Sequence, residues 1–305
     1  MTNWMVLAAG NNPLSHVIPH PFVVAEDGTW IWDTTVGNLL LSGLILIILG
    51  PWIAKKIGTG PESQGHDRFV TRNPFAHVIE VICTYLRENT VRPLLGDRTD
   101  GFMPFLWTLF FFILVNNLLG LVPILDALHL INKDWKAEGI SPFGGTATQN
   151  LAVTGVLAFI AFLVINISGI RQLGIGGYLH HLTGGAPAYI WPILVPVEIL
   201  GIFIKPVALA IRLFANMTAG HTLVATLFMF VGLAANLSFI LSGPITVISV
   251  VAAIAIYFLE IFVAFLQAFV FMFLTTVFIS QLAHHHDHEH DHHEEYPPAE
   301  PVGMI

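Results

Sequence analysis

One permanently charged side chain lies in the middle of a strongly apolar part of the sequence. Between residues 172 and 283 the formally charged side chains are Glu198, Lys205, Arg212 and Glu260. The guanidinium of Arg212 stays protonated at any working pH, so it cannot avoid the cost of burial by becoming neutral. Placing such a charge in hydrocarbon costs at least ~3 kcal/mol. We therefore expect Arg212 to face a partner or a water-filled cavity, which makes it a candidate functional residue.

Polar side chains recur at helical spacing on the last two apolar stretches. They are Glu198, Lys205, Arg212, Asn216 and His221 on the first stretch, and Glu260 and Gln267 on the second. The first three are seven residues apart, as are the last two, and positions seven apart drift only about 20° around a helix. Imidazole titrates near neutral pH, and carboxylate, imidazole, amide and guanidinium groups inside a membrane are the parts of a proton path. The spacing therefore predicts a proton path along these two stretches.

Each of these residues also has a purely structural interpretation. Lys205 lies near an end of its expected helix and could simply extend its amine to the membrane interface. Asn216 and Gln267 could hydrogen-bond between helices, and His221 could be a core histidine whose nitrogens are satisfied. We favour function for His221 because Glu260 is available as its partner.

The remaining alternatives concern an ion pair and two amides. Arg212 and Glu260 could form a buried structural ion pair, but that pair would leave the rest of the polar residues unexplained. Asn116 and Asn117 lie in an earlier apolar stretch. Buried amides of this kind more often serve helix packing than transport, so packing is the first interpretation of both and a place on the path is the second.

The elements that must position these residues are membrane-spanning helices. Of the 305 residues 55% are hydrophobic and only 10% are charged, with a mean hydropathy of +0.74, whereas about a quarter of an ordinary soluble domain is charged. We expect an all-α polytopic membrane protein. The single cysteine, Cys83, excludes an intrachain disulfide framework. Clustered excess Lys and Arg, the mark of a nucleic-acid partner, is missing from the sequence.

Three apolar segments have the length of conventional transmembrane helices, close to the ~20 residues needed to cross hydrocarbon. They are residues 34–52, 103–125 and 147–170. Seven Lys and Arg side chains lie between the first two, so the positive-inside rule puts the intervening segment in the cytoplasm. The cytoplasmic segments are then 53–102, 171–190 and the tail 284–305. The extracytoplasmic segments are 1–33, in which we expect no cleaved signal peptide, and the polar loop 126–146.

Residues 191–283 contain two apolar stretches of roughly 40 residues each, Trp191 to Leu233 and Pro244 to Leu282. A continuous helix of that length reaches ~60 Å, about twice the ~30 Å of bilayer hydrocarbon. We expect two long, strongly tilted membrane helices that form a hairpin at Ala235 to Gly243. The alternative is shorter helices broken at Pro196, Gly201, Pro206 or Gly220.

Two segments outside the spans have patterns of their own. Pro74 to Asn89 has apolar residues at helical spacing and predicts an amphipathic helix on the membrane surface or against a partner, or else a soluble connector helix. Gly174 to Pro187 is rich in glycine and predicts a cytoplasmic turn.

The tail after Ala283 is a mixture of histidines and acids. It could chelate zinc, nickel or copper weakly through His284, His285, His286, His288 and His290. Because acids interrupt the histidines irregularly and no folding context surrounds them, we interpret the tail as a disordered metal-binding or buffering segment. We predict no structural metal site and no cofactor.

The motifs resemble subunit a of the membrane sector of F-type ATP synthases. The resemblance is strongest from Glu198 to Gln281. It is carried by Lys205-Pro-Val, Arg212-Leu-Phe-Ala-Asn-Met-Thr-Ala-Gly-His221 and Leu266-Gln-Ala-Phe-Val-Phe-Met, with support from Asn117-Leu-Leu-Gly-Leu-Val-Pro123. An Arg-Leu-Phe-x-Asn-Met-x-x-Gly run inside an apolar helix is hard to obtain by chance, whereas the first third of the chain agrees mainly in layout.

The resemblance implies a non-catalytic, proton-translocating stator subunit. Arg212 would face the carboxylates of a c-subunit ring and keep protons from passing directly between two aqueous half-channels. The other residues that match the family's polar path are Glu198, Asn216, His221, Glu260 and Gln267, with Lys205, Asn116 and Asn117 as further candidates. The implied partners are the c ring, b-type peripheral-stalk subunits and the rest of the complex. The implied location is a cell inner membrane, with an organelle membrane less favoured.

One feature departs from the best-known bacterial pattern, in which an acid follows the Ala-Gly pair and a histidine lies on the last helix. Here His221 and Glu260 exchange these types, as in mitochondrial-type sequences. If the two sites face each other, the exchange preserves an acid–imidazole pair and leaves the order of proton transfer open.

Two other functions and the identity of the ion stay open at this point. A secondary transporter would predict internal repeats, which the sequence lacks. A divalent-metal transporter would need several His, Asp or Glu ligands within the spans. The coupling ion, H⁺ or Na⁺, depends on the surroundings of the ring carboxylate.

Overall fold

The computed structural model describes residues 21–24, 27, 30–57, 71, 73–122, 124, 141–183, 187, 189–234 and 239–283. Five of its helices are long and apolar enough to cross a membrane, judged over these described residues. This confirms the expectation of an all-α polytopic membrane protein. The histidine-rich tail lies outside the described residues, and so do most of the N-terminal segment and the first part of the loop 126–146.

A two-stranded hairpin precedes the first helix and was not predicted. Strands β1 (Pro21–Val24) and β2 (Trp30–Asp33) are antiparallel, with register irregularities along the pair. Asp33 then caps α2 (Thr34–Ala54), because its carboxylate accepts a hydrogen bond from the backbone N–H of Val36 at 2.8 Å. The helix begins where expected and extends slightly beyond residue 52.

The expected amphipathic helix is part of a longer run of short helices that leads into the second span. The elements are α3 (Pro74–Tyr85), the π-helix η3 (Leu86–Val91), α4 (Arg92–Leu95), the 3₁₀ turn η4 (Gly96–Arg98) and α5 (Thr99–Leu121). Asn73 caps α3, since its side chain accepts from the backbone N–H groups of Phe75 and Ala76. Gly96 has a φ of 54° and lets the chain turn between α4 and α5. The span therefore begins and ends about one turn earlier than the expected 103–125.

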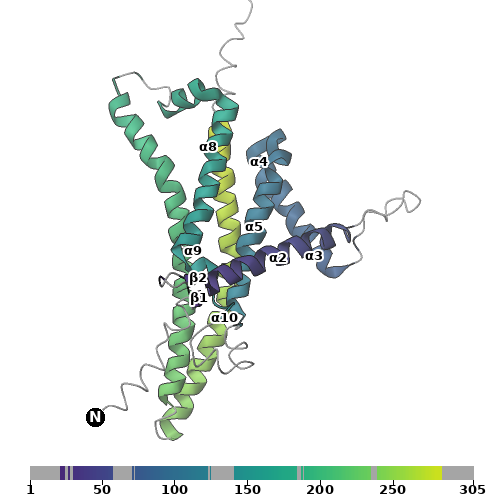
Figure 1. The fold of residues 1–305 in the computed structure, drawn as a ribbon, viewed down its shortest axis with the longest axis vertical. Helices are drawn as coiled ribbons and strands as arrows, with labels where there is room; N and C mark the ends of the chain where they lie inside the picture. Colours follow the sequence, from purple (N-terminus) through teal and green to yellow (C-terminus); the bar gives the residue numbers. More distant parts are fainter. Residues whose placement is uncertain are drawn as a thin grey trace, which may run out of the picture.

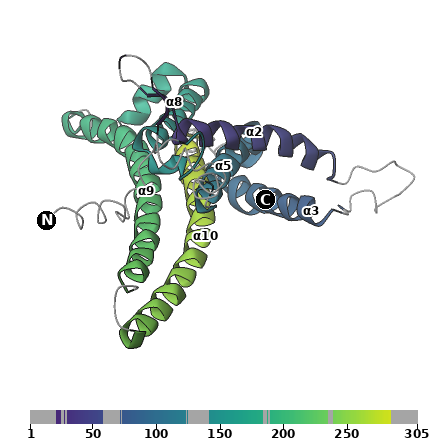
Figure 2. The same cartoon turned by 60° about the horizontal axis from the view of Figure 1, so that its bottom comes forward.

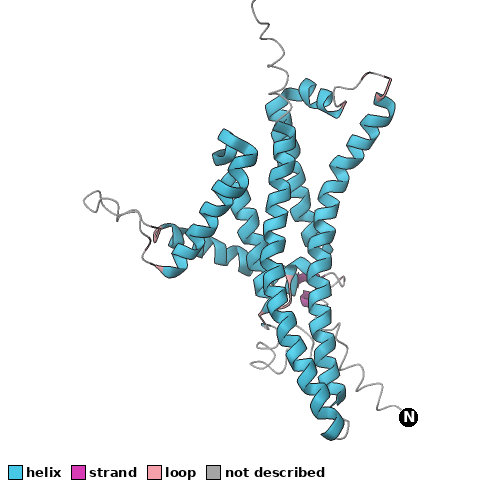
Figure 3. Cartoon of the chain, turned by 180° about the vertical axis from the view of Figure 1, so that it is seen from behind, coloured by secondary structure: helices cyan, strands magenta, loops and turns pink. Residues whose placement is uncertain are grey.

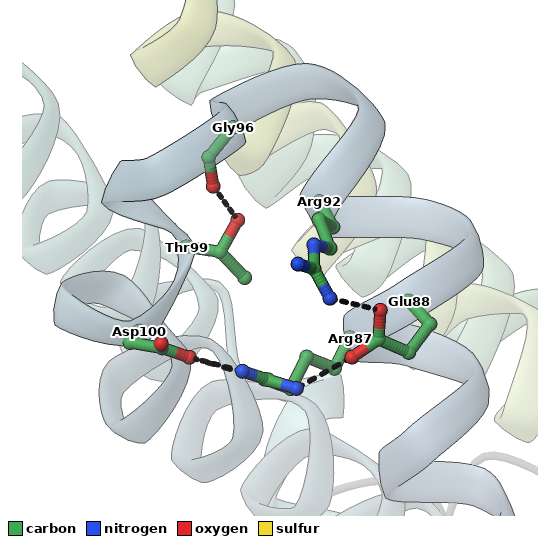
Figure 4. Close-up of polar contacts among 6 residues, drawn as sticks. All are labelled: Arg87, Glu88, Arg92, Gly96, Thr99 and Asp100. Carbon is green, nitrogen blue, oxygen red and sulfur yellow. Dashed lines mark hydrogen bonds and ion pairs between the residues drawn. The ribbon is translucent and has the colours of Figure 1, made fainter.

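Exposed charges tie this run of short helices together (Figure 4). Arg87 contacts Asp100 at the start of α5 at 2.7 Å and Glu88 at 2.5 Å, and Arg92 contacts the other oxygen of Glu88 at 2.7 Å. Thr99 also donates a hydrogen bond to the carbonyl of Gly96 at 2.6 Å. Such exposed pairs orient segments more than they stabilise them. The cluster links η3 and α4 to the start of α5.

The third span continues further than expected. After the 3₁₀ turn η5 (Ala147–Gln149), α8 runs as Leu151–Leu182 with a break at Gly174, whose φ of 69° and ψ of 171° are not helical. The prediction of a turn over Gly174 to Pro187 is therefore wrong for residues 175–182, which form a helical segment beyond the break. Tyr178 on this segment donates a hydrogen bond to the Asn166 side-chain oxygen at 2.5 Å, which holds the segment against the body of α8.

The last two helices are continuous and long. They are α9 (Trp191–Ala234), with 44 residues, and α10 (Phe239–Ala283), with 45. The alternative of separate shorter helices is wrong, because Pro196 and Pro206 lie inside α9. The second helix also begins before the expected Pro244. Figures 1 and 2 show the two helices side by side where α9 ends and α10 begins, with α2 and α3 leading away on the other side.

The core lies where α5, α8, α9 and α10 meet. Its fully buried members include Phe110 and Ile113 of α5, Ala161 of α8, Leu213 of α9, and Ala268 and Phe271 of α10. The amino-terminal part of α9 leads away from α10, as seen from behind in Figure 3, while α8 packs against both. Large apolar side chains on α2, α9 and α10 remain exposed, which fits faces that meet lipid or other subunits.

Candidate functional site

Arg212 lies on an open face of α9. Its side chain is exposed, whereas the next residue, Leu213, is fully buried in the core. Among the described residues Arg212 takes part in no hydrogen bond or ion pair, so the interpretation of Arg212 and Glu260 as a buried ion pair is wrong. A guanidinium presents five N–H donors in one plane. The site therefore offers an unused cation to whatever lies against this face.

Glu260 faces His221 across the interface between α10 and α9. The Glu260 Oε1 atom lies 4.0 Å from Nδ1 of His221, and only 7% of Glu260 is exposed. The neighbouring Gly220 makes this approach possible, because a Cβ atom there would lie only 2.4 Å from Glu260 Oε1. The other ring nitrogen of His221, Nε2, lies 2.7 Å from Oγ1 of Thr146, which precedes η5. We call these three side chains, Thr146, His221 and Glu260, the imidazole cluster.

A second polar contact joins the same two helices one to two turns closer to Arg212. Asn216 donates a hydrogen bond from Nδ2 to Oε1 of Gln267 at 2.9 Å. Three buried polar atoms along this interface have no hydrogen-bond partner among the described residues: Gln267 Nε2, Glu260 Oε2 and Thr218 Oγ1. Native interiors leave few such atoms unpaired, because each costs about 1–3 kcal/mol. The three atoms are therefore free to form hydrogen bonds with water molecules that enter this interface.

Glu198 and Lys205 line a separate cavity on the other side of Arg212 along α9. This lysine cavity has a volume of about 40 Å³, room for a few water molecules. Its other polar lining residues are Asn166 and Tyr178 of α8 and Gln281 of α10. It combines a carboxylate, an amine, two amides and a phenol between α8, α9 and α10.

The position of Lys205 differs from the sequence-based interpretation. Because α9 begins at Trp191, Lys205 is not close to a helix end. Its Nζ donates a hydrogen bond to Oε1 of Gln281 at 3.3 Å and lies 5.0 Å from the ring centre of Phe278. The amine is therefore engaged with side chains near the carboxy-terminal end of α10, at an exposed contact.

The two candidate amides of α5 make contacts of the kind that pack helices together. Asn117 donates to the carbonyl of Ala264 on α10 at 3.3 Å and accepts from Thr148 of η5 at 2.8 Å, so it joins three elements. Asn116 donates to the carbonyl of Phe112 in its own helix at 2.8 Å. Both are buried, which agrees with packing as their first interpretation.

Sequence reasoning missed several polar residues of the site. Gln281 had a usable signal, because it lies fourteen residues, two sevens, after Gln267 on the same helix. Tyr178 had none, because it lies in a segment expected to be a turn. Thr146 had none either, since one threonine in a loop gives no periodic signal.

An open groove of about 760 Å³ runs along α9 beyond Arg212. It is lined mainly by small and apolar side chains, among them Ala215, Thr218, Ala219, Thr222 and Leu223. As for metals, no group of three or more His, Cys, Asp or Glu side chains that could hold an ion occurs within the described ranges. The histidines proposed as weak ligands, His284 to His290, lie outside them.

Comparison with known proteins gives one consistent result. The family described as "ATP synthase A chain" matches residues 38–280. A protein of Myxococcus xanthus named "ATP synthase subunit a" is 44% identical over 241 residues, which cover 77% of this chain and 71% of that protein. A protein of the same name from Chloroherpeton thalassium is 40% identical over 252 residues, covering 81% and 68%. "ATP synthase subunit a 2" of Chlorobaculum tepidum is 43% identical over 214 residues, covering 70% and 53%.

Proposed function

The chain belongs to the ATP synthase A chain family, and we propose on that basis that it is the proton-translocating stator subunit of an F-type ATP synthase. It works against a ring of c subunits, each bearing one carboxylate, and exchanges protons with that ring through two aqueous half-channels. The observation that carries the proposal is Arg212, an exposed cation without an ion-pair partner in the described part of the chain. Polar groups gather on both sides of it along α9.

The spacing along α9 supports two separate routes. Glu198 precedes Arg212 by fourteen positions and His221 follows it by nine, which is about 21 Å and 14 Å at 1.5 Å per residue. Neither gap can be crossed by a single hydrogen bond. A proton that reaches one polar cluster therefore cannot pass directly to the other, and the fixed positive charge between them opposes a water-borne proton that would try.

We assign the imidazole cluster, together with Asn216 and Gln267, to the extracytoplasmic half-channel. The support is its contact with Thr146, at the end of the loop 126–146 expected on that side. We assign the lysine cavity, with Glu198 and Lys205, to the cytoplasmic half-channel. It lies beside the carboxy-terminal part of α8, which carries Arg171, a residue expected to be cytoplasmic.

The residues then have distinct parts in one cycle. During ATP synthesis, a proton passes along the imidazole cluster and the Asn216–Gln267 contact and neutralises a ring carboxylate, which can then turn into lipid. On the other side the returning carboxylate releases its proton toward Glu198, because the guanidinium of Arg212 stabilises the anion. One charge moved through 100 mV is worth ~2.3 kcal/mol, so several protons per turn can drive synthesis elsewhere in the complex. The chain itself performs no ATP chemistry and needs no cofactor.

The surfaces support the remaining parts of the proposal. The exposed face of α9 around Arg212 and the groove beyond it meet the c ring, and b-type peripheral-stalk subunits bind elsewhere on the chain. The protein spans a cell inner membrane several times, with its N-terminus outside and its C-terminus in the cytoplasm. At 44 residues, α9 measures about 66 Å, so it fits within ~30 Å of hydrocarbon only when strongly inclined.

The test is substitution of the arginine in the assembled complex. We expect Arg212→Ala to abolish ATP-driven proton pumping by inverted membrane vesicles while the subunit stays in the membrane at its normal level. The matched control is Ile211→Ala, because Ile211 is the preceding residue and is also exposed but carries no charge; this variant should keep pumping. Normal pumping by Arg212→Ala would overturn the proposal.

A further inference from the structure

The loop that carries Thr146 is held by the first span. Asn38 of α2 is buried, with 1% of its surface exposed. It accepts a hydrogen bond from the backbone N–H of Gly144 at 3.2 Å and donates to the carbonyls of Gly144 at 2.8 Å and Gly145 at 2.5 Å. One amide thus satisfies three backbone groups of a loop that lies more than 100 residues later in the chain.

Close packing removes the remaining freedom of this loop. The indole N–H of Trp32 donates to the carbonyl of Pro142 at 3.1 Å. A Cβ atom on Gly37 would lie 1.9 Å from that same carbonyl oxygen, so α2 touches the loop backbone directly. A Cβ atom on Gly120 of α5 would lie 1.7 Å from Thr146 Oγ1. The loop is therefore packed against α2 at Pro142 and against α5 at Thr146, and neither helix has a side chain at its point of contact.

Fixing the threonine fixes the imidazole. Thr146 Oγ1 lies 2.7 Å from Nε2 of His221, and this contact sets the plane of the ring. With the ring in this plane, Nδ1 points at Glu260 at 4.0 Å. A ring flipped about its Cβ–Cγ bond would present carbon to Glu260, and carbon cannot transfer a proton.

We propose that Asn38 is a positioning residue for proton transfer, which acts by holding residues 144–146 so that Thr146 orients His221 toward Glu260. The inference rests on the proposed function. An asparagine suits the task because its amide both donates and accepts. Alanine would leave three backbone groups without this partner, two of them buried, and aspartate would keep the acceptor and lose the donor. Misplacement of a reacting group by ~1 Å can cost about 10²-fold in rate.

The experiment starts from the complete complex, assembled in inverted membrane vesicles. The catalytic sector is then removed, and proton conduction through the remaining membrane sector is measured and normalised to the amount of this subunit in the membrane. We expect Asn38→Ala to lower conduction at least about tenfold and Asn38→Asp to lower it at least as much, because a carboxylate oxygen would face the carbonyl oxygens of Gly144 and Gly145. The matched control is Ser42→Ala. Ser42 is as buried as Asn38 on the same helix, but its hydroxyl donates only to the carbonyl of Leu39 in that helix, so conduction should stay normal.

A double-mutant cycle separates positioning from a general structural role. Thr146→Val removes the hydroxyl at nearly constant shape, and Thr146→Ser keeps it. If Asn38 acts through Thr146, the double variant Asn38→Ala with Thr146→Val conducts as poorly as Thr146→Val alone, and Thr146→Ser is near normal. Losses that multiply in the double variant would overturn the inference, and so would normal conduction by Asn38→Ala. If Asn38→Ala lowers the subunit level, Asn38→Asp takes its place in the cycle with the same two outcomes.

The Arg212→Ala variant, measured for ATP-driven pumping in vesicles that keep the catalytic sector, separates the two proposals. Normal pumping by Arg212→Ala overturns the proposed function whatever the Asn38 variants do. Loss of pumping by Arg212→Ala together with multiplicative losses in the double variant overturns only the role of Asn38.

Discussion

Gly220 offers a direct way to disturb the imidazole cluster without changing any of its chemical groups. A Cβ atom at this position would lie 2.4 Å from Oε1 of Glu260 and 3.2 Å from its Cγ and Cδ. An ordinary carbon–oxygen contact is about 3.4 Å, so Gly220→Ala has to push the carboxylate, or the two helices, apart by about 1 Å. Overpacking of this kind costs about 1–3 kcal/mol. Movement of a reacting group by ~1 Å can lower a rate about 10²-fold.

We therefore expect Gly220→Ala to lower proton conduction by one to two orders of magnitude, measured in vesicles stripped of the catalytic sector. Gly232→Ala is the matched control, because Gly232 is on the same helix and a Cβ atom added there would meet nothing within 4 Å. Glu260→Asp shortens the acid by one methylene and makes room for the new methyl group. The double variant Gly220→Ala with Glu260→Asp should therefore conduct better than Gly220→Ala alone. Normal conduction by Gly220→Ala would refute the idea that close approach at this point sets the geometry of the path.

Three further expectations follow from the described contacts. The double variant His221→Glu with Glu260→His should recover part of the proton pumping lost in either single variant, because the two side chains face each other at 4.0 Å. An absence of recovery in vesicle pumping assays would contradict this. Tyr178→Phe should slow coupled proton transport severalfold, because it removes the phenolic hydroxyl from the lysine cavity. Tyr189→Phe, at an exposed position, should leave the rate unchanged. Equal rates in the two variants would argue against a role for Tyr178. Asn117→Leu should destabilise the helix bundle by about 1–3 kcal/mol, because it leaves the buried Thr148 hydroxyl without its partner and removes the hydrogen bond to the Ala264 carbonyl. A thermal melt of the purified complex unchanged from the parent would contradict packing as its task.

Periodicity predicted the parts of the site that lie on long helices. Charged and amide side chains spaced seven residues apart predicted the polar faces of α9 and α10, because residues at that spacing lie on nearly the same face of a helix. The length of the two apolar stretches predicted two helices too long to cross a bilayer upright. These features are local, so the sequence contains them directly.

Contacts between distant segments could not be predicted in this way. The hydrogen bonds of Asn38 join α2 to residues more than 100 positions away, and the Thr146–His221 contact spans 75 positions. Neither leaves a periodic pattern, because loop backbone groups pair according to the tertiary arrangement. The helix beyond Gly174 was missed for a related reason: glycines indicated a turn, but one glycine with positive φ makes the bend and the hydrogen bond from Tyr178 holds the helical segment after it.

The length of α9 also bears on how far water must enter the bilayer. A helix of about 66 Å confined to ~30 Å of hydrocarbon gains less than half an ångström of depth for each ångström along its axis. The stretch from Glu198 to Arg212 then corresponds to about 10 Å of depth, and that from Arg212 to His221 to about 6 Å. With the two half-channels proposed above, water entering from each surface would thus come close to the midplane and leave only a thin insulating layer around the arginine, across which most of the transmembrane voltage would fall.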